Sequence, residues 1–459
     1  MFNKIAIFAL LLFGISFAQV EIPAEYLGEA LQNNLALKQK EFSLGKSIAA
    51  LDEARGMFLP RIDLFSRYSR AGGGREIDIP IGELVNPMQS ALNLLLQSKV
   101  FPADLPNEKI MFLREREHDT KLRLTQPLFQ PKIYYNYSLN KKLSQIEKAA
   151  KNKYVRELIA DVKTAYINFL QAGEAVDIYQ NYMKLLVENK RVNESLVKNG
   201  KATPDVVYRA DAEIADMEKK ISNAETTKKS AHYYFNFLLN KDLNSEIKIP
   251  LEEMNSEKIE NIDFYIQSAL KNREEVFQLN TAVQAMESKA DIYRSDYLPN
   301  LNLAVDYGFQ GEEYKFNSES DYWMASLVLN WNIFNGFSDE AKVSQAIFSK
   351  KESEARLMEV EKLITLEVRK TIDETESAQK TLSSARKNKL ASEQSFKMID
   401  KKYREGMTGY IEYLDAFNQV SVSDIELLIE KYNVKKSFIK LEKVSARVEL
   451  EKFIKNNED

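Results

Sequence analysis

Side chains able to do chemistry are few and scattered along this chain of 459 residues. His118 and His232 are isolated from each other, and cysteine is absent. The sequence contains no Ser-His-Asp set, metal-ligand cluster or glycine-rich phosphate loop, so it does not favour an enzyme, a metal site or a bound cofactor. Glu412 and Asp415 are three residues apart and would share one helix face. In a chain with 68 acidic residues, an ordinary solvated helix surface would also contain such a pair.

The charge balance gives no reason to expect a nucleic-acid partner. The chain carries 64 basic and 68 acidic residues, for a net charge of -4. A nucleic-acid-binding protein usually concentrates positive charge on one surface. The composition instead favours a solvated helical surface that carries many salt bridges.

The elements that would position Glu412 and Asp415 are long helices. Glycine and proline are scarce, at 15 and 11 residues, which favours uninterrupted helices. Apolar spacing predicts helices over 24–58, 133–198, 204–240, 338–405 and 410–455. Two of these helices have alternating three- and four-residue spacing, which is typical of coiled coils. Their seam residues are Val207, Ala210, Ile214, Met217, Ile221 and Ala224, and then Ile411, Leu414, Asn418, Ser421, Ile425, Leu428 and Tyr432.

Four short segments follow a different rule, with apolar and polar residues in alternation. This pattern predicts strands over about 62–71, 119–129, 300–311 and 322–334. Each has about the length of a tilted transmembrane β-strand. The same alternation would also fit a small soluble sheet with one wet face.

The N-terminus has the features of a signal peptide over 1–18. Lys4 supplies a positive charge, 5–17 is apolar, and Ser16-Phe17-Ala18 fits a cleavage site that would leave Gln19 first. A short membrane anchor is the alternative. Later segments lack the roughly 20 consecutive apolar residues of a transmembrane helix, so we expect any membrane insertion to be by strands.

The chain is internally duplicated. Residues 59–64 match 298–303, and residues 122–129 match 327–334. The matches predict two repeats, 19–245 and 246–459, each with the order helix, strand, loop, strand, very long helix and return helix. Four strands are too few to close a membrane barrel, which needs about eight. Three copies would supply twelve strands in a closed cyclic assembly.

In this duplicated order, the chain resembles the TolC-like outer-membrane efflux proteins over about 24–455. The resemblance rests on Leu-Pro followed by an alternating strand (59–64 and 298–303), on the strand exits 126–129 and 331–336, and on the turn and helix start at 403–416. It implies a mostly α protein with a β-barrel portion. The protomer would be a duplicated strand and long-helix hairpin, and the homotrimer a 12-stranded outer-membrane β-barrel continuous with a periplasmic α-helical barrel.

The resemblance also implies a function. Such a protein is a passive exit duct of a tripartite efflux or type I secretion system in the outer membrane of a Gram-negative bacterium. Its partners are outer-membrane lipid, a periplasmic adaptor and an inner-membrane pump, and it has no enzyme activity. From the residues alone, a periplasmic coiled-coil scaffold or adaptor without a membrane barrel remains the alternative.

The family's functional positions map onto the ends of the helical hairpins. Tyr403, Glu412 and Asp415 match the pore aperture, where six carboxylates from three copies would favour cations. Thr408 stands where some members carry an arginine that braces the closed state. The hairpin tips, which we expect to contact the adaptor or pump, are Gly200, Lys201, Asp205, Gly406, Met407 and Thr408. The loop 72–118 is unusually long, contains an amphipathic stretch over 88–100, and is expected to be an extracellular cap.

Overall fold

The computed structural model of the protein describes residues 22–249 and 259–447. The expected signal peptide at 1–18 lies outside the described residues. Two compact units can be distinguished. The helical unit comprises Met1–Ala49, Lys141–Met286 and Phe348–Asp459, and the strand unit comprises Ala50–Asn140 and Glu287–Ile347.

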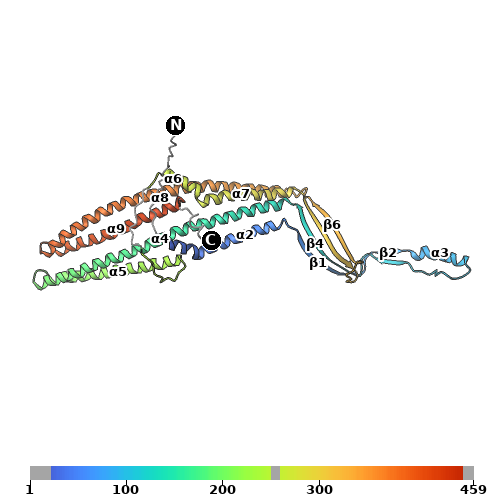
Figure 1. The fold of residues 1–459 in the computed structure, drawn as a ribbon, viewed down its shortest axis with the longest axis horizontal. Coiled ribbons are helices and arrows are strands. Elements are labelled where there is room, and N and C mark those ends of the chain that lie inside the picture. Colours follow the sequence, from blue (N-terminus) through green and yellow to red (C-terminus); the bar gives the residue numbers. More distant parts are fainter. Residues whose placement is uncertain (1–21, 250–258, 448–459) are drawn as a thin grey trace, which may run out of the picture. The chain divides into compact units, whose positions relative to one another are not determined.

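Long helices make up most of the described chain (Figure 1). In chain order they are α1 (Ala24–Asn33), α2 (Leu35–Gly56), α3 (Ile81–Leu95), α4 (Pro131–Lys198), α5 (Asp205–Leu238), α6 (Ile262–Asn272), α7 (Glu274–Arg294), α8 (Ser338–Arg404) and α9 (Tyr410–Val444). The 68 residues of α4 correspond to a length of about 100 Å. No helix within the described ranges is long and apolar enough to cross a membrane.

The order of elements occurs twice. Two short helices, one strand pair, one very long helix and one return helix appear as α1, α2, β1, β4, α4 and α5, and again as α6, α7, β5, β6, α8 and α9. In both halves, the first short helix packs on the long helices of the same half. Tyr26 of α1 packs on Tyr166 of α4 and Phe235 of α5, whereas Tyr265 of α6 joins a core that includes Phe438 of α9.

The predicted helix over 24–58 is wrong in one respect, because a break at Asn34 divides it into α1 and α2. The Asn34 backbone is extended, with ψ of 122°. Its side-chain oxygen accepts hydrogen bonds from the backbone N–H groups of Ala36 and Leu37, both at 3.0 Å, and so caps α2. Its amide group donates to the Leu238 carbonyl at 2.9 Å. These bonds outweigh the helical periodicity at this position.

The coiled-coil seams lie where their spacing predicts. Every predicted seam residue of α5 is buried or half-buried. In α9 the same holds except for Ile411, which is exposed at the hairpin tip. The seams therefore pack the helices side by side, as a 3.5-residue period requires.

Both hairpin tips use the same backbone turn. After α4, Gly200 has φ of +66° and the Lys201 N–H donates to the Leu196 carbonyl at 2.9 Å. After α8, Gly406 has φ of +73° and the Met407 N–H donates to the Lys402 carbonyl at 2.8 Å. This is the Schellman arrangement, which needs a left-handed residue just beyond the helix and so favours glycine.

The strand unit contains one four-stranded antiparallel sheet in the order β1-β4-β5-β6 (Figure 1). The strands are β1 (Arg61–Arg70), β4 (Arg116–Phe129), β5 (Asn300–Gly311) and β6 (Asp321–Asn330). Their register separates two faces. One row across the sheet is apolar, with Leu64, Leu122, Tyr307 and Trp323. The next row is largely polar, with Asp63, Arg123, Asp306 and Met324.

The strand predicted over 322–334 ends earlier, at Asn330. Asn330 pairs with Asn300, the first residue of β5, so that the partner strand ends there. Pro299, which precedes Asn300, has no N–H to offer a ladder. The Trp331 indole N–H instead donates to the Tyr297 carbonyl at 3.0 Å. The alternation of apolar and polar residues in the sequence thus continues beyond Asn330, although backbone pairing with β5 ends there.

The segment between β1 and β4 is folded rather than a plain loop. It contains the two-stranded hairpin β2 (Glu76–Ile79) and β3 (Glu108–Met111), with α3 between them. The helix begins earlier in the chain than the predicted amphipathic stretch at 88–100 and includes Pro87. We call residues 72–115 the excursion.

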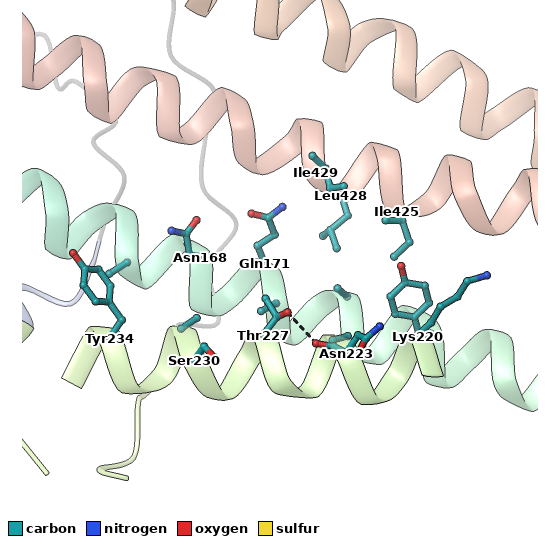
Figure 2. A pocket seen from close by; sticks show the side chains of 16 residues that line it. Asn168, Gln171, Lys220, Asn223, Thr227, Ser230, Tyr234, Ile425, Leu428 and Ile429 are labelled. Carbon is teal, nitrogen blue, oxygen red and sulfur yellow. Dashed lines mark hydrogen bonds between the residues drawn. The ribbon is translucent and has the colours of Figure 1, made fainter. Parts of the chain in front are cut away.

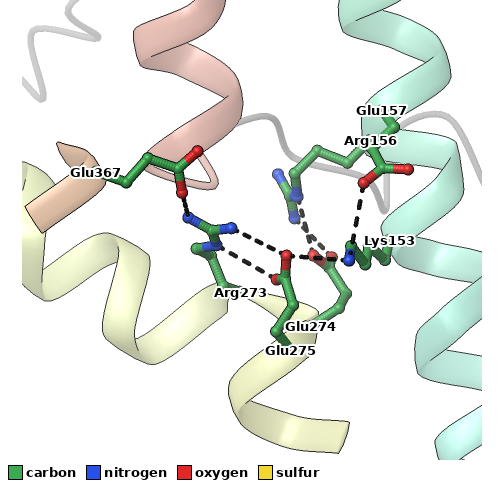
Figure 3. A network of polar contacts seen from close by, with 7 residues as sticks. All are labelled: Lys153, Arg156, Glu157, Arg273, Glu274, Glu275 and Glu367. Atoms are coloured by element: carbon green, nitrogen blue, oxygen red, sulfur yellow. Dashed lines mark hydrogen bonds and ion pairs between the residues drawn. The ribbon is translucent and has the colours of Figure 1, made fainter. Parts of the chain in front are cut away.

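A polar network connects the two repeats inside the helical unit (Figure 3). The Arg156 guanidinium on α4 donates to both carboxylate oxygens of Glu274, at 3.1 and 2.8 Å, and both side chains are largely buried. Arg273, in the break between α6 and α7, pairs with Glu275 at 2.9 Å and with Glu367 of α8 at 2.5 Å. Glu274 and Glu275 begin α7, where a helix favours negative charge.

Glu275 makes the stability of this network depend on pH. Burial alone would raise the pKa of its carboxyl group, but the hydrogen bonds and charge of Arg273 outweigh burial and lower the pKa to about 2. Because an unfolded glutamate has a pKa near 4.5, the stabilisation is complete above pH 4.5 and is lost as the pH falls toward 2. Glu275→Gln should reduce the free energy of unfolding at pH 7 by up to roughly 3 kcal/mol. Melting followed by circular dichroism at pH 7, 4.5 and 3 measures this.

Glu157→Gln is the matched control, because Glu157 contacts the same network only through Lys153, at 3.9 Å. Between pH 4.5 and 3 the Glu275→Gln variant should lose less stability than the wild type, whereas the control should follow the wild type. Equal acid sensitivity of the wild type and Glu275→Gln would contradict this account.

The left-handed glycine at each hairpin tip leads to a second prediction. Gly406→Ala places a Cβ on a left-handed residue, which costs roughly 1 kcal/mol. Gly409→Ala is the control, because Gly409 has φ of -78° and open space around its Cα. Hydrogen exchange followed by mass spectrometry should show amides near the tip exchanging about fivefold faster in Gly406→Ala only. An unchanged rate in that variant would show that the turn is not strained by the side chain.

Candidate aperture at the hairpin tips

All the predicted site residues lie at the tips of two helical hairpins in the helical unit. Gly200, Lys201 and Asp205 belong to the α4/α5 tip, and the remaining residues belong to the α8/α9 tip. The two turns are equivalent in backbone geometry but differ in side chains. Aligned on Gly200 and Gly406, Arg209 of the first tip takes the place of Asp415 in the second.

Asp205 opens α5 and is exposed. The Thr203 hydroxyl donates a hydrogen bond to its carboxylate, and the Arg209 guanidinium lies 3.5 Å away. The hydrogen bond from Thr203 and the charge of Arg209 lower the pKa of Asp205. Asp205 therefore remains negative at neutral pH and sits at the positive end of a helix.

The second tip has an acidic face. Glu412 and Asp415 are both exposed and lie one helical turn apart on α9. The Thr408 hydroxyl donates to the Glu412 carboxylate, which fixes one of the two acidic groups against the turn. Thr408 thus holds an acid on its own tip with a short hydroxyl side chain.

Tyr403 lies in the interior of the tip rather than on its surface, with 5% of its area exposed. Its hydroxyl donates to the Asn193 side-chain oxygen at 2.6 Å, and so connects α8 to α4. Asn193 is itself fully buried, and its amide group donates to the Val206 carbonyl at 3.2 Å. Burial raises the pKa of Tyr403 to about 12, so the hydroxyl keeps its proton at neutral pH and remains a donor.

Aromatic rings surround this hydrogen bond. The Tyr403 ring centroid lies 5.0 Å from that of Tyr413 and 5.6 Å from that of Tyr410. Phe417 extends the cluster and meets Tyr182 of α4 edge-on at 5.6 Å. The α8/α9 tip is therefore packed on the α4/α5 tip by one apolar core with a buried hydrogen bond inside it.

Asn193 was not predicted as part of the site. The signal was present in the spacing, because Tyr182, Leu186, Asn189 and Asn193 follow each other at intervals of four, three and four residues. A polar residue in such a seam usually specifies one partner and one register. Which residue it contacts could not be read from the sequence, since Tyr403 is 210 positions away.

A groove of about 720 Å³ runs between α4, α5 and α9, away from the tips (Figure 2). Small side chains form much of its lining, among them Ala165, Ala172, Ala175, Ala224 and Ala231. Figure 2 shows Asn168 and Gln171 on α4, Thr227 on α5 and Leu428 on α9 among the side chains that line it. Lys220 is the one charged side chain among the described residues that line this groove.

The strand unit has a charged cluster on its polar face. The Arg123 guanidinium donates to both carboxylate oxygens of Asp306 at 2.7 Å, and Asp306 is 1% exposed. Lys121 lies 3.4 Å from Asp306 and 3.2 Å from Asp119. Gly308 makes room for Lys121, since a Cβ there would come within 2.5 Å of the lysine Cβ. The alternation of polar and apolar residues along the strands predicts that these side chains share one face. Which of them pair depends on the register between the strands.

A metal site does not emerge from the described part of the chain, where no group of three or more His, Asp or Glu side chains could hold an ion. The candidate functional features of the described residues are thus exposed tips, an acidic helix face and a charged sheet face.

Comparison with known proteins gives this arrangement a family. The family described as "Outer membrane efflux protein" matches residues 26–233 and 265–447. Curated proteins include no match to the sequence. Among solved structures, the chain is similar to the outer-membrane channel OprN, with 16% identity, 92% of this chain and 89% of that chain covered, and a TM-score of 0.76.

Two further structures show the same fold. The CmeC outer membrane channel of Campylobacter jejuni is 16% identical, with 94% of this chain and 88% of that chain covered and a TM-score of 0.76. The open state of the MtrE outer membrane channel of Neisseria gonorrhoeae is 16% identical, with coverages of 92% and 88% and a TM-score of 0.73. The predicted mostly helical fold with strand pairs is confirmed, and the scaffold alternative is set aside by the family match. The chain belongs to the outer membrane efflux protein family and is an outer-membrane efflux channel rather than an enzyme.

Proposed function

We propose that three copies of this channel form the exit duct of a tripartite efflux or type I secretion system. A periplasmic adaptor and an inner-membrane pump would deliver the cargo at the hairpin tips, and the duct would conduct it passively to the outside. In this proposal the repeats 19–245 and 246–459 each supply two strands to a shared barrel and one helical hairpin to a shared tunnel.

The observation that carries the trimer is the open sheet of the protomer. Among the described residues, β1 and β6 each have a strand partner on one side only. A strand edge in lipid leaves N–H and C=O groups unsatisfied, each at a cost of several kcal/mol. Pairing β6 of one copy with β1 of the next removes every edge, and three copies reach a size at which the barrel encloses water.

The tips suit contact with an adaptor or pump. Lys201 and Met407 are exposed on the two turns, and Met407 has 68% of its area accessible. Methionine adapts to uneven apolar partners, and the two tips differ in charge at Arg209 and Asp415. A partner could therefore tell the two kinds of tip apart.

The aperture would be lined by Glu412 and Asp415 of each copy. Both side chains are exposed in the protomer and share one face of α9. A ring of six carboxylates attracts cations and repels anions. Tyr403 would act behind this ring, because its hydrogen bond to Asn193 holds the α8/α9 tip against α4.

Conductance in planar bilayers tests the acidic ring. Glu412→Gln with Asp415→Asn should bring the cation-to-anion permeability ratio toward one and abolish block by divalent cations. The matched control is Asp373→Asn with Glu376→Gln, a second exposed pair three residues apart, but in the middle of α8. Wild-type selectivity in the tip variant, or an equal change in the control, would exclude the ring.

Tyr403→Phe tests the brace. The ring still fills the core, but the donor to Asn193 is lost, and a buried hydrogen bond contributes about 1 kcal/mol. We expect the open-to-closed ratio of single channels to rise by about fivefold for each copy whose tip moves independently.

Tyr413→Phe is the control for this experiment. Tyr413 is equally buried in the same cluster, and its hydroxyl makes no hydrogen bond within the described part of the chain. An open-to-closed ratio unchanged by Tyr403→Phe, or changed as much by Tyr413→Phe, would contradict a brace between Tyr403 and Asn193.

A further inference from the structure

The excursion between β1 and β4 presents an apolar helix face to solvent. Along α3, Leu84, Met88, Ala91, Leu92 and Leu95 form one stripe, and all five are exposed. Leu95 is 80% exposed, Leu84 67% and Met88 65%. A contiguous apolar surface of this kind usually marks a contact with something else.

The polar side of α3 is already in use. Asn86 exchanges two hydrogen bonds with the backbone of Leu105, both at 2.9 Å. Asn93 accepts from the backbone N–H groups of Val100 and Phe101, also at 2.9 Å. The return segment therefore covers the asparagine side of the helix. The apolar stripe faces away from its own chain because of this pinning, and local folding cannot bury it.

The stripe has the spacing of a helix–helix seam. Leu84, Met88, Ala91 and Leu95 follow at intervals of four, three and four residues, which is a period of 3.5. Helices with this period pack against one another around a common axis. The spacing favours a helical partner with the same period over an irregular surface.

The charge of α3 argues against a lipid surface. Helices that lie on membranes usually carry lysine and arginine on their polar face. The only charged residue of α3 is Glu83, and its polar face consists of asparagine, glutamine and serine. With so little charge, identical copies of α3 also have no electrostatic reason to avoid one another.

We propose that the α3 stripes of the three copies pack against each other across the exit of the barrel. This inference rests on the proposed trimer, which brings three excursions to one rim. Twelve strands spaced by about 4.8 Å and tilted by about 40° enclose a cylinder of roughly 12 Å radius. The 15 residues of α3 span about 22 Å, enough to reach the axis. The excursion then forms a helical cap that narrows the exit.

Disulfide trapping tests this contact directly, because the chain has no cysteine of its own. Met88→Cys and, separately, Leu95→Cys are expressed in the full-length protein and oxidised with copper phenanthroline in intact outer membranes. Residues at such a seam come within disulfide distance in neighbouring helices. We expect most of the protein to run as cross-linked dimers, with the third copy of each trimer left single. Ser90→Cys, exposed on the other side of the same helix, should remain monomeric on the same gel.

Native mass spectrometry of each variant in detergent tests the trimer separately from the helical cap. If the variants are trimers and neither stripe cysteine cross-links, or if Ser90→Cys cross-links equally, the cap is overturned while the trimer stands. A stripe cysteine that neither cross-links nor reacts with a water-soluble maleimide is covered by lipid or by another protein, which also overturns the cap. If no trimer is found, the proposed function fails together with this inference.

Discussion

The open edges of the four-stranded sheet are the constraint from which the rest of the architecture follows. A row of side chains from Leu64 through Leu122 and Tyr307 to Trp323 makes one face apolar, which suits it to lipid. Lipid cannot satisfy the backbone of β1 and β6, and so in the proposed assembly the copies complete each other. On the opposite face, the pair of Arg123 and the buried Asp306 fixes the register, because a slip of one strand by one residue would turn one of the two charges toward the apolar side.

The helices of the helical unit must also be held in one register, and they are held by different contacts. Helices in the wall of the proposed tunnel would bury only part of their surface, and several separate apolar clusters here replace one large core. Specificity then comes from a few buried polar contacts. The Arg156–Glu274 pair holds α4 to α7, and the Tyr403–Asn193 hydrogen bond holds α8 to α4. If the helices slid past one another, each contact would break and leave an unsatisfied buried group. These contacts therefore raise the free energy of other helix registers more than they stabilise the native one.

Much of this organisation could be predicted from the sequence because it depends on periodicity. The very long helices, the coiled-coil seams, the glycine turns and the alternating strands all follow from local spacing. Failures occurred where a nonlocal or side-chain bond decided the outcome. Asn34 breaks a periodic helix by capping, Trp331 leaves the ladder where Pro299 cannot pair, and Asn193 finds Tyr403 only after both hairpins have packed. Helix geometry predicts that Glu412 and Asp415 share one face, but their proposed place around a pore depends on neighbouring copies.

The central claim is that three copies, and no other number, complete one barrel. The mass of the detergent-solubilised particle, measured by native mass spectrometry after purification from outer membranes, tests it most directly. The account predicts a single species at three times the mass of the single chain, which dissociates only under conditions that also unfold the sheet. A stable monomer, a dimer or a ring of four would contradict it, because the edges of β1 and β6 would then have to be satisfied in some other way.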